Sequence, residues 1–188
     1  GKYDIIERAR IDEERGWYYF YASPDNGTQR YLYRVSLEGG GEAERVTPSG
    51  QEGSHRYEFS PDARWAFHTF SNFDTPPVTQ LIEMEGHRII RVLEGNEGLN
   101  KRAQDLIDQS TEFFQVDIGD DIVIDGWMIK PPGFDPAKKY PVVVYVYGEP
   151  HGQTVLDSWG ASQALYHRTL AKLGYVVVSM DNRGTPAP

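Results

Sequence analysis

Residues 141–147 read PVVVYVY, an unbroken run of β-branched and aromatic side chains. A run without polar alternation is typical of a strand buried on both faces, as in parallel sheets covered by helices. Residues 158–173 follow with apolar side chains at helical spacing, and Gly174 then provides a common helix stop. Residues 175–180, YVVVSM, form a second apolar run. The order strand, helix, strand predicts a βαβ unit and therefore an α/β domain.

The residues before this unit add two more expected strands. Residues 113–118 and 122–130 are strand-like, and a Gly-Asp-Asp turn at 119–121 separates them. Asp125-Gly126 interrupts the second strand, either as a tight hairpin or, as we prefer, as a bulge or kink. We assign residues 112–188 to the N-terminal part of an α/β domain. Residues 175–180 are then expected at the open edge of a half-built sheet, which a longer chain or an oligomer such as a homodimer would cover.

Residues 1–95 have a different pattern of short strands and turns. A pair of similar units is visible when Trp17 is laid over Trp65 and residues 33–35 over 82–84. A period of about 40–50 residues with about four strands per unit is the signature of a β-propeller blade. Two units cannot close a propeller, so we expect the C-terminal blades of a larger propeller that begins before Gly1. The clearest predicted strands are residues 17–22, 31–36, 64–69, 78–83 and 87–93.

A polar stretch, residues 96–111, separates the two regions. Leu99, Ala103, Leu106 and Ile107 in it fall at helical spacing. We interpret the stretch as a connector with a short helix. The fold class predicted from sequence is therefore mixed, with partial β-propeller blades followed by an α/β domain.

Four local motifs follow one another along the chain. Residues 59–65 read FSPDARW, residues 126–131 GWMIKP, residues 140–153 YPVVVYVYGEPHGQ, and residues 181–185 DNRGT. This set resembles the dipeptidyl peptidase IV branch of the prolyl oligopeptidase family. The resemblance implies that the α/β part is the start of an α/β-hydrolase domain. Two positions depart from the family pattern, because Ala63 and Glu149 stand where glycine is usual.

The resemblance implies a serine exopeptidase that acts on peptides and releases N-terminal dipeptides with Pro or Ala at the second position, through an acyl-enzyme. Two alternatives stay open. In the first, the protein would be an endopeptidase or acylaminoacyl peptidase of the same family. In the second, it would be a binding protein of this architecture whose nucleophile has been replaced. The residue at the nucleophile position distinguishes the last alternative from the enzymes.

Tyr147 is the one catalytic residue that the resemblance implies within these 188 residues. It matches the family tyrosine whose hydroxyl donates to the oxyanion, and a phenol remains a donor near neutral pH. The alternative is a core tyrosine with a satisfied hydroxyl. No G-x-S-x-G nucleophile motif is present, and Ser162 is expected to be a simple helix serine. We therefore expect Ser, Asp and His of the triad beyond Pro188, and an isolated chain without activity.

Composition excludes several other functions. The formal net charge is −9 and the pI about 5.0, and no Lys/Arg cluster offers a surface for nucleic acid. There is no cysteine, so disulfides and thiolate chemistry are excluded. The five histidines look scattered and lack metal-ligand spacing, so we expect neither a metal nor a cofactor. No apolar run approaches the roughly 18 residues of a membrane span.

Overall fold

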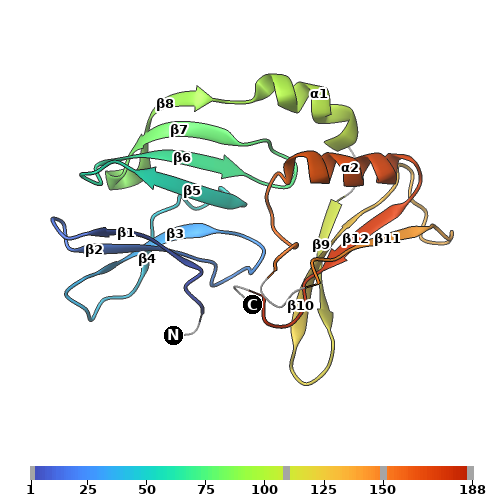
Figure 1. Ribbon diagram of the computed structural model, residues 1–188, viewed down its shortest axis with the longest axis horizontal. Coiled ribbons are helices and arrows are strands. Elements are labelled where there is room, and N and C mark those ends of the chain that lie inside the picture. The colour runs from blue at the N-terminus through green and yellow to red at the C-terminus, as the bar shows by residue number, and fades with distance from the viewer. Residues whose placement is uncertain (1–2, 108–110, 149–151, 186–188) are drawn as a thin grey trace.

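The computed structural model describes residues 3–107, 111–148 and 152–185. These residues form three four-stranded sheets and two α-helices (Figure 1). In Figure 1 the first two sheets are stacked on one side of the molecule, and the third lies on the other side beneath helix α2 (Ala161–Lys172). The part of the chain described here contains no helix that is long and apolar enough to cross a membrane.

The first two sheets are antiparallel meanders in which each strand pairs with its neighbours in sequence. The first contains β1 (Glu7–Asp12), β2 (Trp17–Ala22), β3 (Tyr31–Ser36) and β4 (Glu44–Arg45). The second contains β5 (Ser54–Phe59), β6 (Trp65–Ser71), β7 (Val78–Glu83) and β8 (Arg88–Glu94), with a short 3-10 turn (Glu85–His87) before β8. The five strands predicted here are confirmed with bounds within two residues. Strands β1 and β5 were not predicted, because their charged and polar side chains mask the strand pattern.

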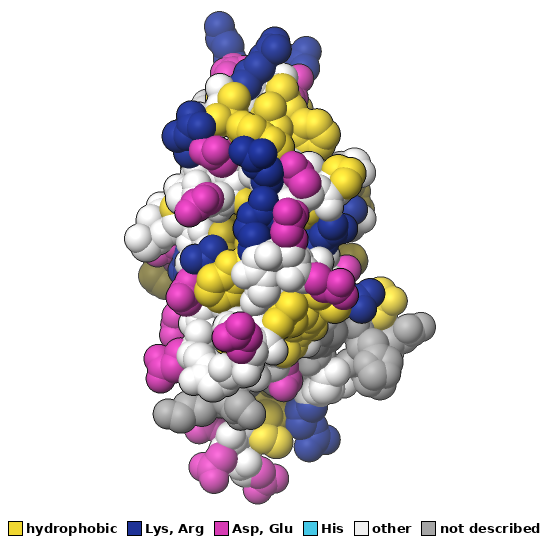
Figure 2. Space-filling view, turned by 90° about the vertical axis from the view of Figure 1, so that its left-hand side faces the viewer, with side chains coloured by type: hydrophobic (Ala, Val, Ile, Leu, Met, Phe, Trp, Pro, Cys, Tyr) yellow, Lys and Arg dark blue, Asp and Glu magenta, His cyan; other side chains and the backbone are white. Residues whose placement is uncertain are grey.

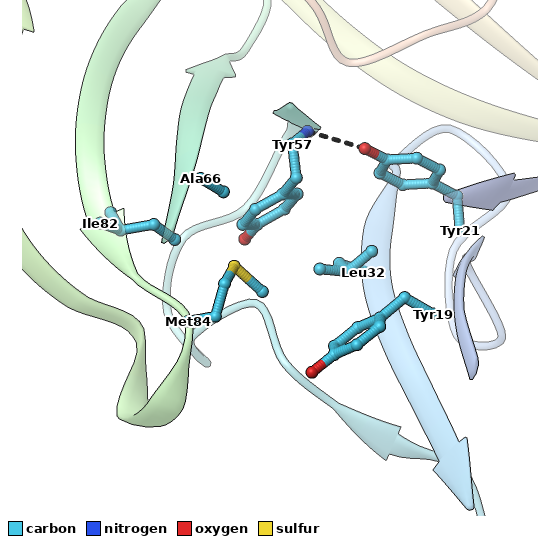
Figure 3. Packing of buried hydrophobic residues seen from close by; sticks show 7 residues of the cluster. All are labelled: Tyr19, Tyr21, Leu32, Tyr57, Ala66, Ile82 and Met84. Carbon is cyan, nitrogen blue, oxygen red and sulfur yellow. Dashed lines mark hydrogen bonds between the residues drawn. The ribbon is translucent and has the colours of Figure 1, made fainter. Parts of the chain in front are cut away.

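The repeat inferred from sequence is visible in the two sheets, because Trp17 and Trp65 each begin the second strand of their sheet. The sheets pack face to face through one buried cluster (Figure 3). Tyr21 of β2 accepts a hydrogen bond at its hydroxyl from the backbone N–H of Tyr57 in β5, at 2.7 Å. Apolar burial of this kind is the main stabilising term in such packing. The cluster consists of Tyr19, Tyr21, Leu32, Tyr57, Ala66, Ile82 and Met84.

The FSPDARW segment is a tight turn between β5 and β6. Ser60 Oγ accepts from the backbone N–H of Trp65 at 3.0 Å and donates to Asp62 Oδ1 at 2.6 Å. Ala63 has a φ of 51°, in the left-handed region where glycine is favoured, which explains why related turns use glycine here. The turn is therefore formed by side-chain bonds that hold Ala63 in a conformation unusual for it.

The third sheet is mixed and has the order β11-β12-β10-β9. Strands β11 (Val142–Tyr145) and β12 (Val176–Met180) are parallel, and α2 connects them, so the predicted βαβ unit is confirmed. Strands β9 (Thr111–Asp117) and β10 (Val123–Ile129) complete the sheet in antiparallel pairing. Helix α2 begins three residues later than predicted. Helix α1 (Glu97–Ile107) lies in the predicted connector.

Strand β10 corrects the expected break at Asp125-Gly126. Every residue from Val123 to Ile129 pairs in unbroken register with β9, so neither a bulge nor a hairpin forms. Glycine is needed at position 126 for a different reason. A Cβ at Gly126 would lie 2.5 Å from the ring of Phe114 on β9, so the absent side chain makes room for that ring.

The position of β12 corrects two further expectations. It lies between β11 and β10, so residues 175–180 do not form the open edge. That edge belongs to β11, whose Val142 and Val144 are 58% and 55% exposed. The run that looked buried on both faces is therefore covered on one face only, the face on which Val143 and Tyr145 pack against the core of the third sheet.

Candidate active site around Tyr147

Tyr147 lies two residues beyond the end of β11, at the carboxyl edge of the parallel pair. Its side chain is 57% exposed, so within the described residues it is not part of a core. Its ring lies directly against Gly152, where an added Cβ would fall 1.5 Å from a ring carbon. Gly152 thus supports the tyrosine ring, and any larger residue at this position would displace it.

A pocket of about 350 Å³ opens beside Tyr147. Its walls come from four places: the third sheet, the segment 153–160 that leads into α2, the first half of α2 and a loop between β6 and β7 that contributes Phe73. Aromatic rings dominate the lining, with centroids of Phe73 and Trp127 5.5 Å apart. The lining residues most relevant here are Phe73, Trp127, Tyr145, Tyr147, Gln163 and His167.

His167 is the titratable imidazole of this pocket. It is buried on α2, its Nε2 lies 2.9 Å from Gln163 Nε2, and its ring centroid is 5.3 Å from that of Trp127. Burial lowers the pKa of His167 below its usual value, which favours a neutral ring. His151 falls outside the described residues. Ser162 is exposed in the first turn of α2, as expected of a simple helix serine.

A carboxylate holds the segment that follows Gly152. Asp181, which is 7% exposed, accepts the backbone N–H of Thr154 at 2.7 Å and that of Val155 at 3.1 Å. Thr154 Oγ1 also donates to Asp181 Oδ1 at 2.9 Å and lies 2.7 Å from Ser179 Oγ. Ser179 Oγ in turn donates to the carbonyl oxygen of Tyr145 at 2.8 Å. One polar cluster therefore contacts the chain on both sides of Tyr147.

The same segment attaches the third sheet to the other two through Asp157. Its Oδ2 accepts from Gln29 Nε2 at 3.0 Å, and its Oδ1 accepts from the backbone N–H of Phe73 at 2.9 Å. Its own N–H donates to the carbonyl of Thr28 at 2.7 Å, and its carbonyl accepts from Ser54 Oγ at 2.8 Å. This role of Asp157 could not be predicted from the sequence, because its partners are as many as 128 positions away.

Three of the five histidines, which looked scattered in the sequence, lie together at the interface of the first two sheets. His55 Nδ1 is 2.9 Å from His68 Nε2, and the two rings are stacked. His87 Nε2 is 2.8 Å from the hydroxyl of Tyr57. The only available signal was the alternation along β5, which places His55 and Tyr57 on one face. No group of three or more His, Cys, Asp or Glu among the described residues is arranged to hold a metal ion.

Comparisons with known proteins agree with this architecture. The protein-family model of the dipeptidyl peptidase IV N-terminal region matches residues 1–77. The "Probable dipeptidyl-aminopeptidase B" of Emericella nidulans is 34% identical over 98% of this chain, and that of Neosartorya fischeri is 32% identical over the same share. The crystal structure of Porphyromonas gingivalis dipeptidyl peptidase 4 covers 100% of this chain with a TM-score of 0.85 and 27% identity.

The chain belongs to the dipeptidyl peptidase IV-like branch of the prolyl oligopeptidase family. Its two antiparallel sheets are accordingly blades of a partial β-propeller. This dipeptidyl peptidase IV-like chain spans 20% of the length of each of the two curated relatives and 26% of the Porphyromonas chain.

Proposed function

We propose that the complete protein is a serine-type exopeptidase that releases N-terminal dipeptides, with Pro or Ala preferred at the second position. The observation that carries the proposal is the 34% identity, over 98% of this chain, to a protein named as a dipeptidyl-aminopeptidase. The position of Tyr147 supports it. In open α/β sheets ligands bind outside the carboxyl ends of the strands, and Tyr147 follows the carboxyl end of β11.

The proposal includes the domain organisation. Residues 1–95 are the C-terminal blades of the propeller, 96–111 a connector, and 112–188 the N-terminal part of an α/β-hydrolase domain. The parallel β11-α2-β12 unit supports the hydrolase assignment, because a parallel pair with a crossover helix is the basic unit of α/β folds. Helix α1, between the second and third sheets, supports the assignment of the connector.

In the proposed mechanism, a serine outside these 188 residues attacks the peptide carbonyl, a histidine transfers the proton, and an aspartate orients the histidine. Tyr147 donates its phenolic hydrogen to the oxyanion that forms during the attack. A donor aimed at developing charge typically contributes a factor of about 10²–10³ to the rate. The exposed position of Tyr147, with its ring supported by Gly152, leaves the side chain accessible for this contact.

The serine mechanism can be tested by labelling the complete protein with a fluorophosphonate probe while its hydrolysis of a Gly-Pro chromogenic substrate is followed. We expect one labelled serine, outside residues 1–188, and loss of activity in proportion to labelling. Hydrolysis that persists in the fully labelled protein would contradict a serine nucleophile. Absence of both labelling and hydrolysis would instead favour the non-catalytic binding protein.

A further inference from the structure

We propose that Asp181 is a positioning residue for Tyr147, acting through Thr154 and Gly152. The inference rests on the proposed role of Tyr147 in oxyanion binding. Asp181 touches neither Tyr147 nor the pocket beside it, so its effect would be transmitted by the segment of backbone that it holds.

Asp181 holds the segment after Gly152 through several hydrogen bonds. Its two carboxylate oxygens accept two backbone N–H groups and one hydroxyl, all from the adjacent residues Thr154 and Val155. Hydrogen bonds to an ionised acceptor are roughly twice as strong as neutral ones. Asp181 itself is fixed, because it is 7% exposed and its N–H donates to the carbonyl of Asp125 on the neighbouring strand β10 at 3.1 Å. A buried and anchored carboxylate thus fixes the backbone at Thr154.

Gly152 connects Thr154 to the tyrosine ring. Gly152 precedes Thr154 by two residues, and the ring of Tyr147 packs on its Cα with no room for a side chain. The carbonyl of Thr154 is also held, because it accepts from Trp127 Nε1 at 2.9 Å. A shift of Thr154 would therefore move the surface on which the ring rests.

The same polar cluster also holds the strand that leads into Tyr147. Ser179 Oγ lies 2.7 Å from Thr154 Oγ1 and donates to the carbonyl of Tyr145. The cluster consequently fixes the backbone two residues before the tyrosine as well as the surface beneath its ring. Misplacement of a catalytic group by about 1 Å can cost about 10²-fold in rate. Asp181, which does not line the pocket, therefore affects catalysis through a cluster that fixes both sides of Tyr147.

A charge on the propeller also acts on this cluster. Arg30, which precedes β3, is bonded to Gln153 and to the carbonyl of Gly27. Burial lowers the pKa of Arg30 to about 10, and the nearby charge of Asp181 opposes this shift. The carboxylate of Asp181 therefore lies close enough to the propeller blade for its charge to act on the guanidinium of Arg30.

The test is a double-mutant cycle in the complete protein, measuring kcat and KM for a dipeptide substrate. We expect Asp181→Asn to lower kcat by about 10- to 100-fold with KM nearly unchanged, because the lost geometry matters only in the transition state. In a Tyr147→Phe background the same change should alter kcat by no more than about twofold, since the hydroxyl being positioned is already gone. Thr154→Val should behave like Asp181→Asn, and Thr154→Ser should restore activity.

Asp62→Asn is the matched control, because Asp62 also accepts a side-chain and a backbone bond but lies in the propeller turn. It should leave kcat unchanged. If Tyr147→Phe slows the enzyme and Asp181→Asn slows it equally in both backgrounds, the positioning role is overturned while the proposed function stands. If Tyr147→Phe leaves kcat unchanged, the role of Tyr147 fails, and the positioning role fails with it.

Discussion

Tyr147 is the residue on which the proposed chemistry depends, and its replacement gives the clearest prediction at this scale. Tyr147→Phe keeps the ring on Gly152 and removes only the hydroxyl. We expect kcat of the complete protein to fall by about 10²–10³ with little change in KM. Tyr166→Phe is the matched control, because Tyr166 on α2 is 58% exposed against 57% for Tyr147. Equal kcat values for the two variants would contradict the assignment.

The roles of some single residues could not be predicted from the sequence. Tyr147 was found because a motif resembling that of a family surrounds it. Asp157 and Asp181 carried no comparable signal, since their role comes from contacts with residues far away along the chain. Gly126 was misinterpreted for a similar reason. Its meaning depends on the ring of Phe114, which only the pairing of β9 with β10 brings close.

Asp157 gives a second prediction at the residue scale, measured as stability. Asp157→Ala removes two accepted bonds that join the third sheet to the propeller blades, and it leaves the N–H of Phe73 without its partner. An unsatisfied buried donor costs about 1–3 kcal/mol. Urea unfolding of the 188-residue chain should report a loss of this size. The exposed Asp117 serves as control, because its side chain accepts the N–H of Gly119 and no other hydrogen bond from the described residues. An equal loss for Asp117→Ala would contradict this prediction.

At the scale of elements, strands were predictable where aromatic or β-branched residues dominate. Strands β2, β3 and β7 have the bounds that the pattern indicated. Strand β1 was not predicted, because its sequence is charged. Its pairing with β2, and not its own side chains, makes it a strand. The order of the third sheet could not be predicted either. It depends on where β12 inserts, which is a property of the crossover and not of any one strand.

The cluster of His55, His68 and His87 makes the interface between the first two sheets sensitive to acid. Burial lowers the pKa of His55 to about 4 and that of His68 to about 3. The groups that face them are Arg45 on β4, His87 before β8 and the amide of Gln80 on β7. Burial disfavours a positive charge on His55 and His68 most strongly. The charge of Arg45, and that of a protonated His87, disfavour it further.

This cluster yields a signed pH prediction. Both folded-state pKa values lie below the unfolded value of about 6.5, so the unfolded chain binds more protons as the pH falls below that value. Stability is therefore fully present above about pH 6.5. It should be lost on acidification toward pH 4, by up to about 1.4 kcal/mol per pH unit for each histidine. Urea unfolding between pH 7.5 and 5 should give a steeper slope for the wild type than for His68→Gln. Identical slopes would contradict this.

At the scale of the whole molecule, charged side chains and exposed apolar side chains share the surface. On the face seen in Figure 2, basic and acidic side chains are interspersed with apolar areas. The edge strand β11 and the outer strand β8 expose several large apolar side chains. An exposed apolar edge is an aggregation hazard unless another element covers it. The most exposed of these residues are Val142, Val144, Ile89 and Val92.

The proposed release of dipeptides by the complete protein can be tested by mass spectrometry of the products. The substrate is a peptide of about ten residues with proline at position 2, supplied with either a free or an acetylated amine, and the isolated 188-residue chain serves as the inactive control. We predict that the complete protein releases the N-terminal dipeptide from the free-amine peptide only. Cleavage of the acetylated peptide, or no cleavage of either peptide, would contradict the claim.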